Sequence, residues 1–275
     1  MLYPEFLWKD RHFSDSEVLP CEKGIRIQQN EDAMFGYAYL PGGSPDQRHP
    51  CVICLHGLPG YTTNQDIAHA LRRMGFVVLN PFYRGAWGSQ GWFTLSGMVE
   101  DVTAVVNWCQ SHEALEDYGI DGNNVFLLGI SMGGWAAING LCRCPKVKGA
   151  IALAPADIEC LEREQPQLFQ NAYNKYGCLH IESPQTLVQD ASLHREDMGL
   201  LHLTDALRNR PLLLIGGGRD SVVPPDRVLV PFWEALSKQD ATGCKQFEIL
   251  DTGHSFADCR MALTQRIAQW LLDRI

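Results

Sequence analysis

The sequence contains no long apolar run. No stretch approaches the roughly 20 consecutive apolar residues that a helix needs to cross a bilayer. The first residues include Pro4, Glu5, Lys9 and Asp10, so they lack the unbroken apolar segment of a secretory signal peptide. We therefore expect a cytoplasmic protein without a membrane partner.

The sequence also has no long run of lysine or arginine. Its formal net charge is -9 at pH 7, and acidic and basic residues are interspersed along the chain. A nucleic acid or an anionic membrane surface would be bound through clustered positive charge. The charge pattern therefore predicts that neither of them is the main partner.

The cysteine pattern does not predict a metal site. Of the ten cysteines, Cys51 and Cys54 form a C-x-x-C, but they fall inside an apolar run that is typical of a buried strand. Cys142 and Cys144 have no second ligand pair at zinc-finger spacing. We interpret all four as small core residues in the reduced form, and we expect no metal and no organic cofactor.

Short apolar runs alternate with longer amphipathic ones along the 275 residues, without an internal repeat. This alternation is typical of an α/β fold, in which helices cover both faces of a mostly parallel central sheet. With 45% hydrophobic residues the chain suffices for one large domain, and we expect residues 1–275 to form it.

The expected strands are short and are bounded by Gly, Pro, Asn or Asp. Alternating residues over 24–40 indicate an antiparallel hairpin, and buried parallel strands should follow at residues 52–55, 77–80, 125–128, 150–153, 212–215 and 247–250. Apolar residues at helical spacing occur at 98–109 and 263–271. A further helical run at 226–238 should be capped by Asp226 and kinked or split at Pro231.

Residues 155–210 depart from the alternation of short apolar and longer amphipathic runs, because a simple crossover between strands needs far fewer residues. We interpret the segment as a short lid insertion. Its aromatic, leucine and histidine side chains could face a substrate or pack as ordinary helix residues: Leu168, Phe169, Tyr173, Tyr176, His180, Leu187, His194 and His202.

The strongest local signal is a G-x-S-x-G motif centred on Ser131. It follows the apolar strand at 125–128 and precedes a helix-forming run. A serine attacks a carbonyl only when its hydroxyl is exposed and a base takes its proton, and a sharp strand-to-helix turn exposes the hydroxyl above the sheet. Gly129 and Gly133 leave room for this turn, so Ser131 is the expected nucleophile.

Two further segments supply a candidate acid and a candidate base. With Ser131 they follow the chain order Ser, Asp, His, which is the order used where the nucleophile lies on a strand-to-helix turn. Asp220 follows the strand at 212–215, at the carboxyl end where catalytic groups gather in open α/β sheets. His254 follows the strand at 247–250 and would take the proton of Ser131, while Asp220 fixes its tautomer. Asp251 is the rival candidate for the acid.

The glycine-rich segment at 54–60 follows the first parallel strand and should supply part of an oxyanion hole. Two backbone N–H groups are needed there, and the candidates are Met132, directly after the nucleophile, and Leu58. Pro59 has no N–H to donate. His56 is expected to brace this loop rather than to act in catalysis.

In this order the four segments resemble the α/β-hydrolase superfamily along nearly the whole chain. The closest resemblance is to its prolyl-oligopeptidase-like and dienelactone-hydrolase-like branches. Residues 80–89, N-P-F-Y-R-G-A-W-G-S, are similar to the Y/D-x-R-G-x-x-G segment of those peptidases, and residues 218–224, G-R-D-S-V-V-P, are similar to their G-x-D-x-x-V-P acid loop. In relatives with an H-G-type loop, the residue after the H-G pair helps to form the oxyanion hole. The resemblance therefore again implies an oxyanion role for Leu58.

The resemblance implies a cofactor-free serine hydrolase acting on a small-molecule or peptide-like acyl substrate. The chain has no room for the large N-terminal propeller of prolyl-oligopeptidase relatives, and no paired-glutamate signature is recognisable. An ester or thioester is therefore favoured over a peptide. Peptidase, amidase and perhydrolase activities share the same three residues and stay open.

A catalytically silent member of the fold that binds a ligand or a protein is the alternative from another class. Such proteins commonly lose the nucleophile or the histidine, and here both are present. Tyr61, Trp87 and Trp92 are candidates for substrate contact, with core packing as the competing interpretation. The oligomeric state is not indicated by the sequence.

Overall fold

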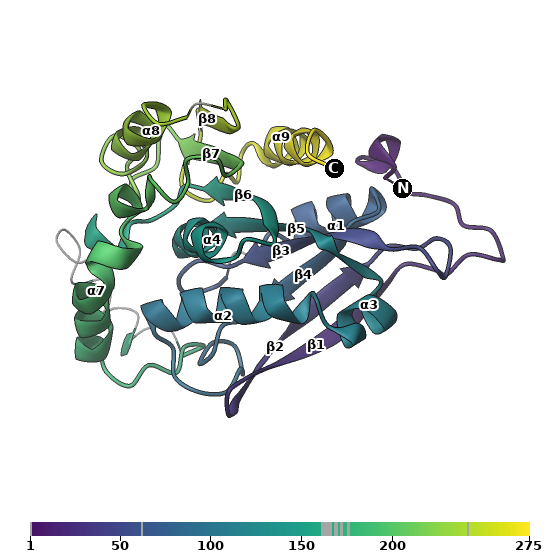
Figure 1. The fold of residues 1–275 in the computed structure, drawn as a ribbon, viewed down its shortest axis with the longest axis horizontal. Coiled ribbons are helices and arrows are strands. Elements are labelled where there is room, and N and C mark those ends of the chain that lie inside the picture. The colour runs from purple at the N-terminus through teal and green to yellow at the C-terminus, as the bar shows by residue number, and fades with distance from the viewer. Residues whose placement is uncertain are drawn as a thin grey trace.

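The computed structural model describes residues 2–61, 63–160, 167, 170, 173–174, 177–240 and 242–275. In these residues the chain forms one eight-stranded sheet in the order β1-β2-β4-β3-β5-β6-β7-β8 (Figure 1). The strands are β1 Cys21–Gln29, β2 Asp32–Leu40, β3 His49–Leu55, β4 Val77–Pro81, β5 Ile120–Ile130, β6 Val147–Leu153, β7 Leu212–Gly217 and β8 Lys245–Leu250. Every predicted strand is found.

The sheet is mostly parallel, as predicted. β1 and β2 form an antiparallel hairpin, and β2 pairs antiparallel with β4. The strands from β4 through β3, β5, β6 and β7 to β8 then pair in parallel. The carboxyl ends of β3, β5, β7 and β8 therefore lie along the same side of the sheet, which we call its carboxyl edge.

Helices cover both faces of the sheet, and each face has its own core. One core contains alternate residues of β3 and β5, such as Ile53 and Leu127, with the buried sides of α2 and α4. The other contains the intervening residues, such as Val52 and Phe126, with α1 and α9. The helices are η1 Pro4–Phe6, α1 Gln65–Arg73, α2 Leu95–Trp108, α3 His112–Tyr118, α4 Met132–Arg143, α7 Pro184–Met198, η2 Leu200–Leu203, α8 Leu229–Ser237 and α9 Arg260–Leu272.

Three local expectations are wrong. The helix at 226–238 begins only at Leu229, and its N-cap is Val228 without a side-chain hydrogen bond, so Asp226 is not the cap. Pro231 thus lies in the first turn of α8, where its missing N–H has no intrahelical partner to lose and no kink is required. β8 is not a buried strand: it forms the sheet edge, and only Lys245 in it is buried.

The described part of the segment 155–210 is anchored to the body of the protein. The Ser96 hydroxyl and N–H donate to the carboxylate of Asp190 in α7. At the end of α7, the carbonyl of Met198 accepts hydrogen bonds from Trp135 and Asn139 of α4. Leu168, Phe169 and Tyr176 lie outside the described residues, and the lid role stays a prediction.

A membrane-spanning helix would need a long and apolar sequence. Among the helices in the described residues, none meets both requirements.

Candidate active site

Ser131 occupies a sharp turn between β5 and α4. Its backbone has φ 57° and ψ -124°, a conformation that non-glycine residues seldom adopt and that functional sites often retain. Its N–H donates to the carbonyl of Leu153 at 2.9 Å, and its carbonyl accepts from Ala156 at 3.1 Å. These bonds to the neighbouring strand and its loop hold the serine at the carboxyl edge of the sheet.

The glycines around Ser131 are required by close backbone contacts. A Cβ atom on Gly129 would lie 1.9 Å from the carbonyl oxygen of Gly133, and one on Gly133 would lie 2.1 Å from that of Leu55. A Cβ on Gly57 would lie 3.0 Å from Cβ of Ser131. The loop after β3 therefore packs directly on the serine turn, and side chains at these positions would force them apart.

Asp220 and His254 form a close pair at the ends of β7 and β8. Nδ1 of His254 lies 2.6 Å from Oδ2 of Asp220, whose side chain is fully buried. The other carboxylate oxygen accepts N–H bonds from Val222 at 2.8 Å and Val223 at 2.9 Å. Because the carboxylate accepts from Nδ1, that nitrogen carries a proton, and in the neutral tautomer that this contact selects Nε2 is the acceptor.

Contacts between the loops after β7 and β8 position this pair. The N–H of Arg219 donates to the carbonyl of Thr252 at 2.9 Å, and Gly218 donates to Leu250 at 2.7 Å. Phe256 is fully buried and anchors the histidine loop in the core. In the described part of the chain, Ser131 Oγ and His254 form no direct hydrogen bond. Such a bond is often long in unliganded enzymes and tightens when substrate binds.

The rival acid Asp251 points elsewhere. Its carboxylate is 90% exposed and forms an ion pair with Nε of Arg219 at 2.9 Å. Nη2 of Arg219 also donates to the main-chain carbonyl of Asp251 at 2.6 Å and to Asp258 at 2.9 Å. The structure therefore brings Asp220, and not Asp251, against His254.

The predicted oxyanion donors belong to two segments that meet at Ser131. Met132 is the first residue of α4, where the N–H groups have no intrahelical acceptor. Leu58 follows Gly57 in the loop that packs on the serine turn. The same loop is held from outside, because Nε1 of Trp87 donates to the carbonyl of Pro59 at 3.1 Å.

His56 braces this loop from inside. Its Nδ1 donates to the carbonyl of Gly57 at 2.8 Å, and its ring packs edge-on against Tyr83 with centroids 4.5 Å apart. Nε2 is buried and has no hydrogen-bond partner among the described residues. Burial lowers the pKa of His56 to about 4, so the ring is neutral at pH 7.

The aromatic candidates lie at the surface rather than in the core. Tyr61, Trp87 and Trp92 are 65%, 40% and 51% exposed. Tyr61 contacts Trp87 edge-on at 5.7 Å, and Trp92 stacks on His180 at 3.8 Å between ring centroids. The structure thus removes the core-packing alternative for all three, and it places Trp87 against the loop of Leu58.

An ion pair that the sequence did not reveal supports the loop of Trp87. The buried carboxylate of Asp101 accepts from the backbone N–H of Arg84 at 2.7 Å and from its Nε at 2.5 Å. Burial raises the pKa of Asp101 to about 6, and Arg84 opposes this rise. Asp101 belongs to an ordinary helix pattern in α2, so no sequence signal could have linked it to this loop.

The described residues show no cluster of three His, Cys, Asp or Glu side chains that could hold a metal ion. Cys51 and Cys54 are buried in β3, as predicted for core residues. Burial raises the pKa of Cys54 to about 12, which keeps it as a thiol.

Comparison with known proteins agrees with this fold. A family model described as "Serine aminopeptidase, S33" matches residues 46–176, which include Ser131 but not Asp220 or His254. The putative esterase YitV of Bacillus subtilis is 26% identical over 215 residues, covering 72% of this chain and 80% of YitV.

Solved structures extend the likeness to nearly the whole chain. The α/β hydrolase GrgF from Penicillium sp. sh18 has a TM-score of 0.70 at 18% identity, covering 92% of this chain and 99% of GrgF. The esterase Pf2001 of Pyrococcus furiosus has a TM-score of 0.68 at 19% identity, covering 93% of this chain and 92% of its own. The sheet order, the serine turn and these likenesses lead to one conclusion: the chain has the α/β-hydrolase fold.

Proposed function

We propose that this hydrolase cleaves carboxylic esters through an acyl-enzyme on Ser131. The observation that carries the proposal is the 2.6 Å contact between Asp220 and Nδ1 of His254, at the same sheet edge as a serine with φ 57°. The contact fixes the histidine tautomer that leaves Nε2 free to accept a proton. A base in this state is what an exposed serine hydroxyl requires for attack.

The residues would act in the following order. Oγ of Ser131 attacks the carbonyl carbon while Nε2 of His254 takes the hydroxyl proton. The N–H groups of Leu58 and Met132 stabilise the oxyanion. His254 then gives the proton to the departing alcohol, which leaves an ester bond between the acyl group and Ser131.

Water then hydrolyses the acyl-enzyme, with His254 acting first as base and then as acid. His254 takes a proton from a water molecule, whose oxygen attacks the acyl-enzyme carbonyl. The second tetrahedral species collapses and returns the proton to Oγ of Ser131, releasing the carboxylic acid. Asp220 stabilises the imidazolium in both halves and stays ionised throughout.

Two observations favour an ester as the substrate. The putative esterase YitV aligns over most of this chain, and Pf2001, which shares the fold, is an esterase. The half-exposed side chains of Tyr61 and Trp87 lie beside the loop of Leu58 and could bind an apolar acyl or alcohol group. A peptidase is the second candidate, because the matching family model describes a serine aminopeptidase.

A panel of p-nitrophenyl esters and aminoacyl p-nitroanilides tests the proposal on the wild type, Ser131→Ala and Ser237→Ala. Ser237 is the matched control, because its hydroxyl is exposed and donates only within α8. We expect short esters to be hydrolysed with a burst of p-nitrophenol, and we expect this activity to vanish only in Ser131→Ala.

Covalent labelling separates the alternatives. A fluorophosphonate should modify Ser131, located by peptide mass spectrometry, and should not modify Ser131→Ala. Faster turnover of anilides than of esters would establish the peptidase candidate. No turnover of either class together with no labelling would overturn the proposal and favour a catalytically silent, ligand-binding protein.

A further inference from the structure

A cavity lies at the end of the sheet opposite to Ser131. It has a volume of about 360 Å³ and is lined by Pro41 and Gly75 among others. Pro41 follows β2, which runs antiparallel to β4, and Gly75 shortly precedes β4. Both residues therefore lie at the amino edge of the parallel strands, whereas Ser131 follows the carboxyl end of β5.

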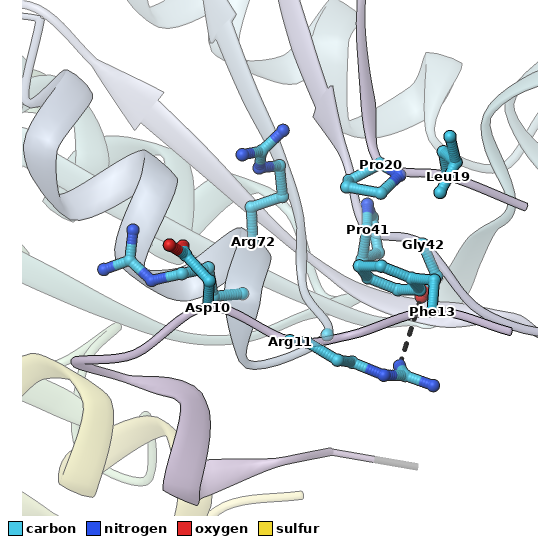
Figure 2. A pocket seen from close by; sticks show the side chains of 10 residues that line it. Asp10, Arg11, Phe13, Leu19, Pro20, Pro41, Gly42 and Arg72 are labelled. Atoms are coloured by element: carbon cyan, nitrogen blue, oxygen red, sulfur yellow. Dashed lines mark hydrogen bonds between the residues drawn. The ribbon is translucent and has the colours of Figure 1, made fainter.

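The cavity combines an apolar wall with arginine side chains (Figure 2). Phe13, Leu19, Pro20 and Pro41 supply the apolar wall, from the N-terminal segment and the loop after β2. On the other side, the last turn of α1 contributes Arg72. A cavity of this size can enclose most of a small organic molecule.

Among the three arginines that line the cavity, Arg72 differs in its partners. Arg11 forms an ion pair with Glu17, and Arg73 donates to the carbonyl of Leu7 at 2.8 Å. Nε of Arg72 is buried and has no hydrogen-bond partner among the described residues. Its terminal nitrogens Nη1 and Nη2 are not among the buried polar atoms, and Arg72 forms no hydrogen bond or ion pair within the described residues, so these nitrogens can donate to an acceptor supplied by a ligand.

The charges also limit the class of ligand. Asp10 lines the same cavity, and in the described part of the chain it forms no ion pair (Figure 2). Its carboxylate would repel a phosphate, which carries up to two negative charges, more strongly than a monoanion. A guanidinium fork matches the two oxygens of a carboxylate, and the apolar wall matches a hydrocarbon body.

We propose that this cavity is a binding site for a small carboxylic acid with an apolar body, whose carboxylate is held by Arg72. The site is separate from the proposed ester hydrolysis, because it shares no residue with the serine turn or with the Asp220–His254 pair. Its occupancy is therefore testable whether or not Ser131 is a nucleophile.

Isothermal titration of the full chain with benzoate tests the site, with benzyl alcohol as the neutral analogue and inorganic phosphate as the alternative anion. The variants are Arg72→Gln, Leu19→Glu and the control Arg208→Gln. The side chain of Arg208 is 58% exposed and lies outside the cavity, so its loss changes the net charge by the same amount. Leu19 is 66% exposed, and a glutamate there adds a negative charge to the wall without disturbing the core.

We expect one benzoate to bind per chain and to bind about tenfold or more weakly to Arg72→Gln, the loss typical of a hydrogen bond to a charged group. Leu19→Glu should weaken it as well, which keeps the test decisive if Arg72→Gln does not fold. Arg208→Gln should bind as the wild type does. Absent binding at millimolar benzoate, wild-type affinity for benzoate in both cavity variants, or tighter binding of phosphate or benzyl alcohol would each overturn the proposal.

Discussion

Mild acid should destabilise the protein through His56. The ordinary pKa of a histidine, about 6.5, applies in the unfolded chain, whereas burial lowers the pKa of His56 to about 4 in the folded protein. Between these two values the unfolded state binds more protons than the folded state. The stability is therefore fully present above about pH 6.5 and is lost as the pH falls toward 4.

The size of the effect follows from the two pKa values. Each pKa unit corresponds to about 1.4 kcal/mol, so His56 can cost at most about 3 kcal/mol in acid. Between pH 7 and pH 5 the linkage relation gives a loss of about 2 kcal/mol. His49, whose pKa is also lowered by burial, adds to the loss in the same direction.

Urea unfolding at pH 7 and pH 5 measures this loss, and His56→Asn isolates the contribution of His56. The asparagine amide can replace Nδ1 as donor to Gly57 but does not titrate, so the variant should lose about 2 kcal/mol less than the wild type between the two pH values. The exposed His112→Asn is the control and should keep the wild-type dependence. Equal losses in the wild type and in His56→Asn would refute the reasoning.

Three substitutions test the site and its scaffold. Asp220→Asn should lower kcat roughly 10⁴-fold, because the amide would favour the tautomer with the proton on Nε2. Trp87→Phe removes the hydrogen bond to Pro59, at 3.1 Å, and should lower kcat/KM about fivefold without a change in thermal stability. Gly129→Ala should destabilise the fold by about 3 kcal/mol or more in urea, because its Cβ would lie 1.9 Å from a carbonyl oxygen.

Each of these variants has a matched control. Asp251→Asn removes an exposed carboxylate paired with Arg219 and should retain activity; a similar loss in both aspartate variants would contradict the assignment of the acid. Trp92→Phe, whose ring stacks on His180, should leave kcat/KM within twofold of the wild type, in contrast to Trp87→Phe. Gly24→Ala places its Cβ where nothing lies within 4 Å, so its stability should match the wild type.

Local patterns were sufficient for the strands because burial imposes them. Residues 125–128 and 212–215 are apolar on both sides of the chain, as they must be when helices cover both faces of a parallel sheet. The G-x-S-x-G turn was equally readable, since its motif is local and Gly129 is required by a contact within the turn itself, with the carbonyl of Gly133. Local sequence therefore predicted the elements and the serine turn.

Edges and caps were less predictable. The apolar residues of β8 resemble those of a central strand, but no strand covers its outer side. Asp226 has a side chain suited to an N-cap, yet α8 begins after Val228 because the chain first completes a turn against β7: the N–H of Val230 bonds to the carbonyl of Pro225 at 2.8 Å. The first outcome depends on which strands are neighbours in the sheet, and the second on a turn that the apolar pattern does not reveal.

The sequence alone thus predicted the strands along the chain, the serine turn and three candidates for an acid and a base. Only the tertiary structure decided that Asp220 rather than Asp251 meets His254, because both aspartates follow strands that end at the same edge and only one side chain turns inward. The cavity at Arg72 was likewise invisible in the sequence, because it joins segments that are far apart in the chain. Periodicity reports which face is buried, whereas contacts between distant loops require the folded backbone.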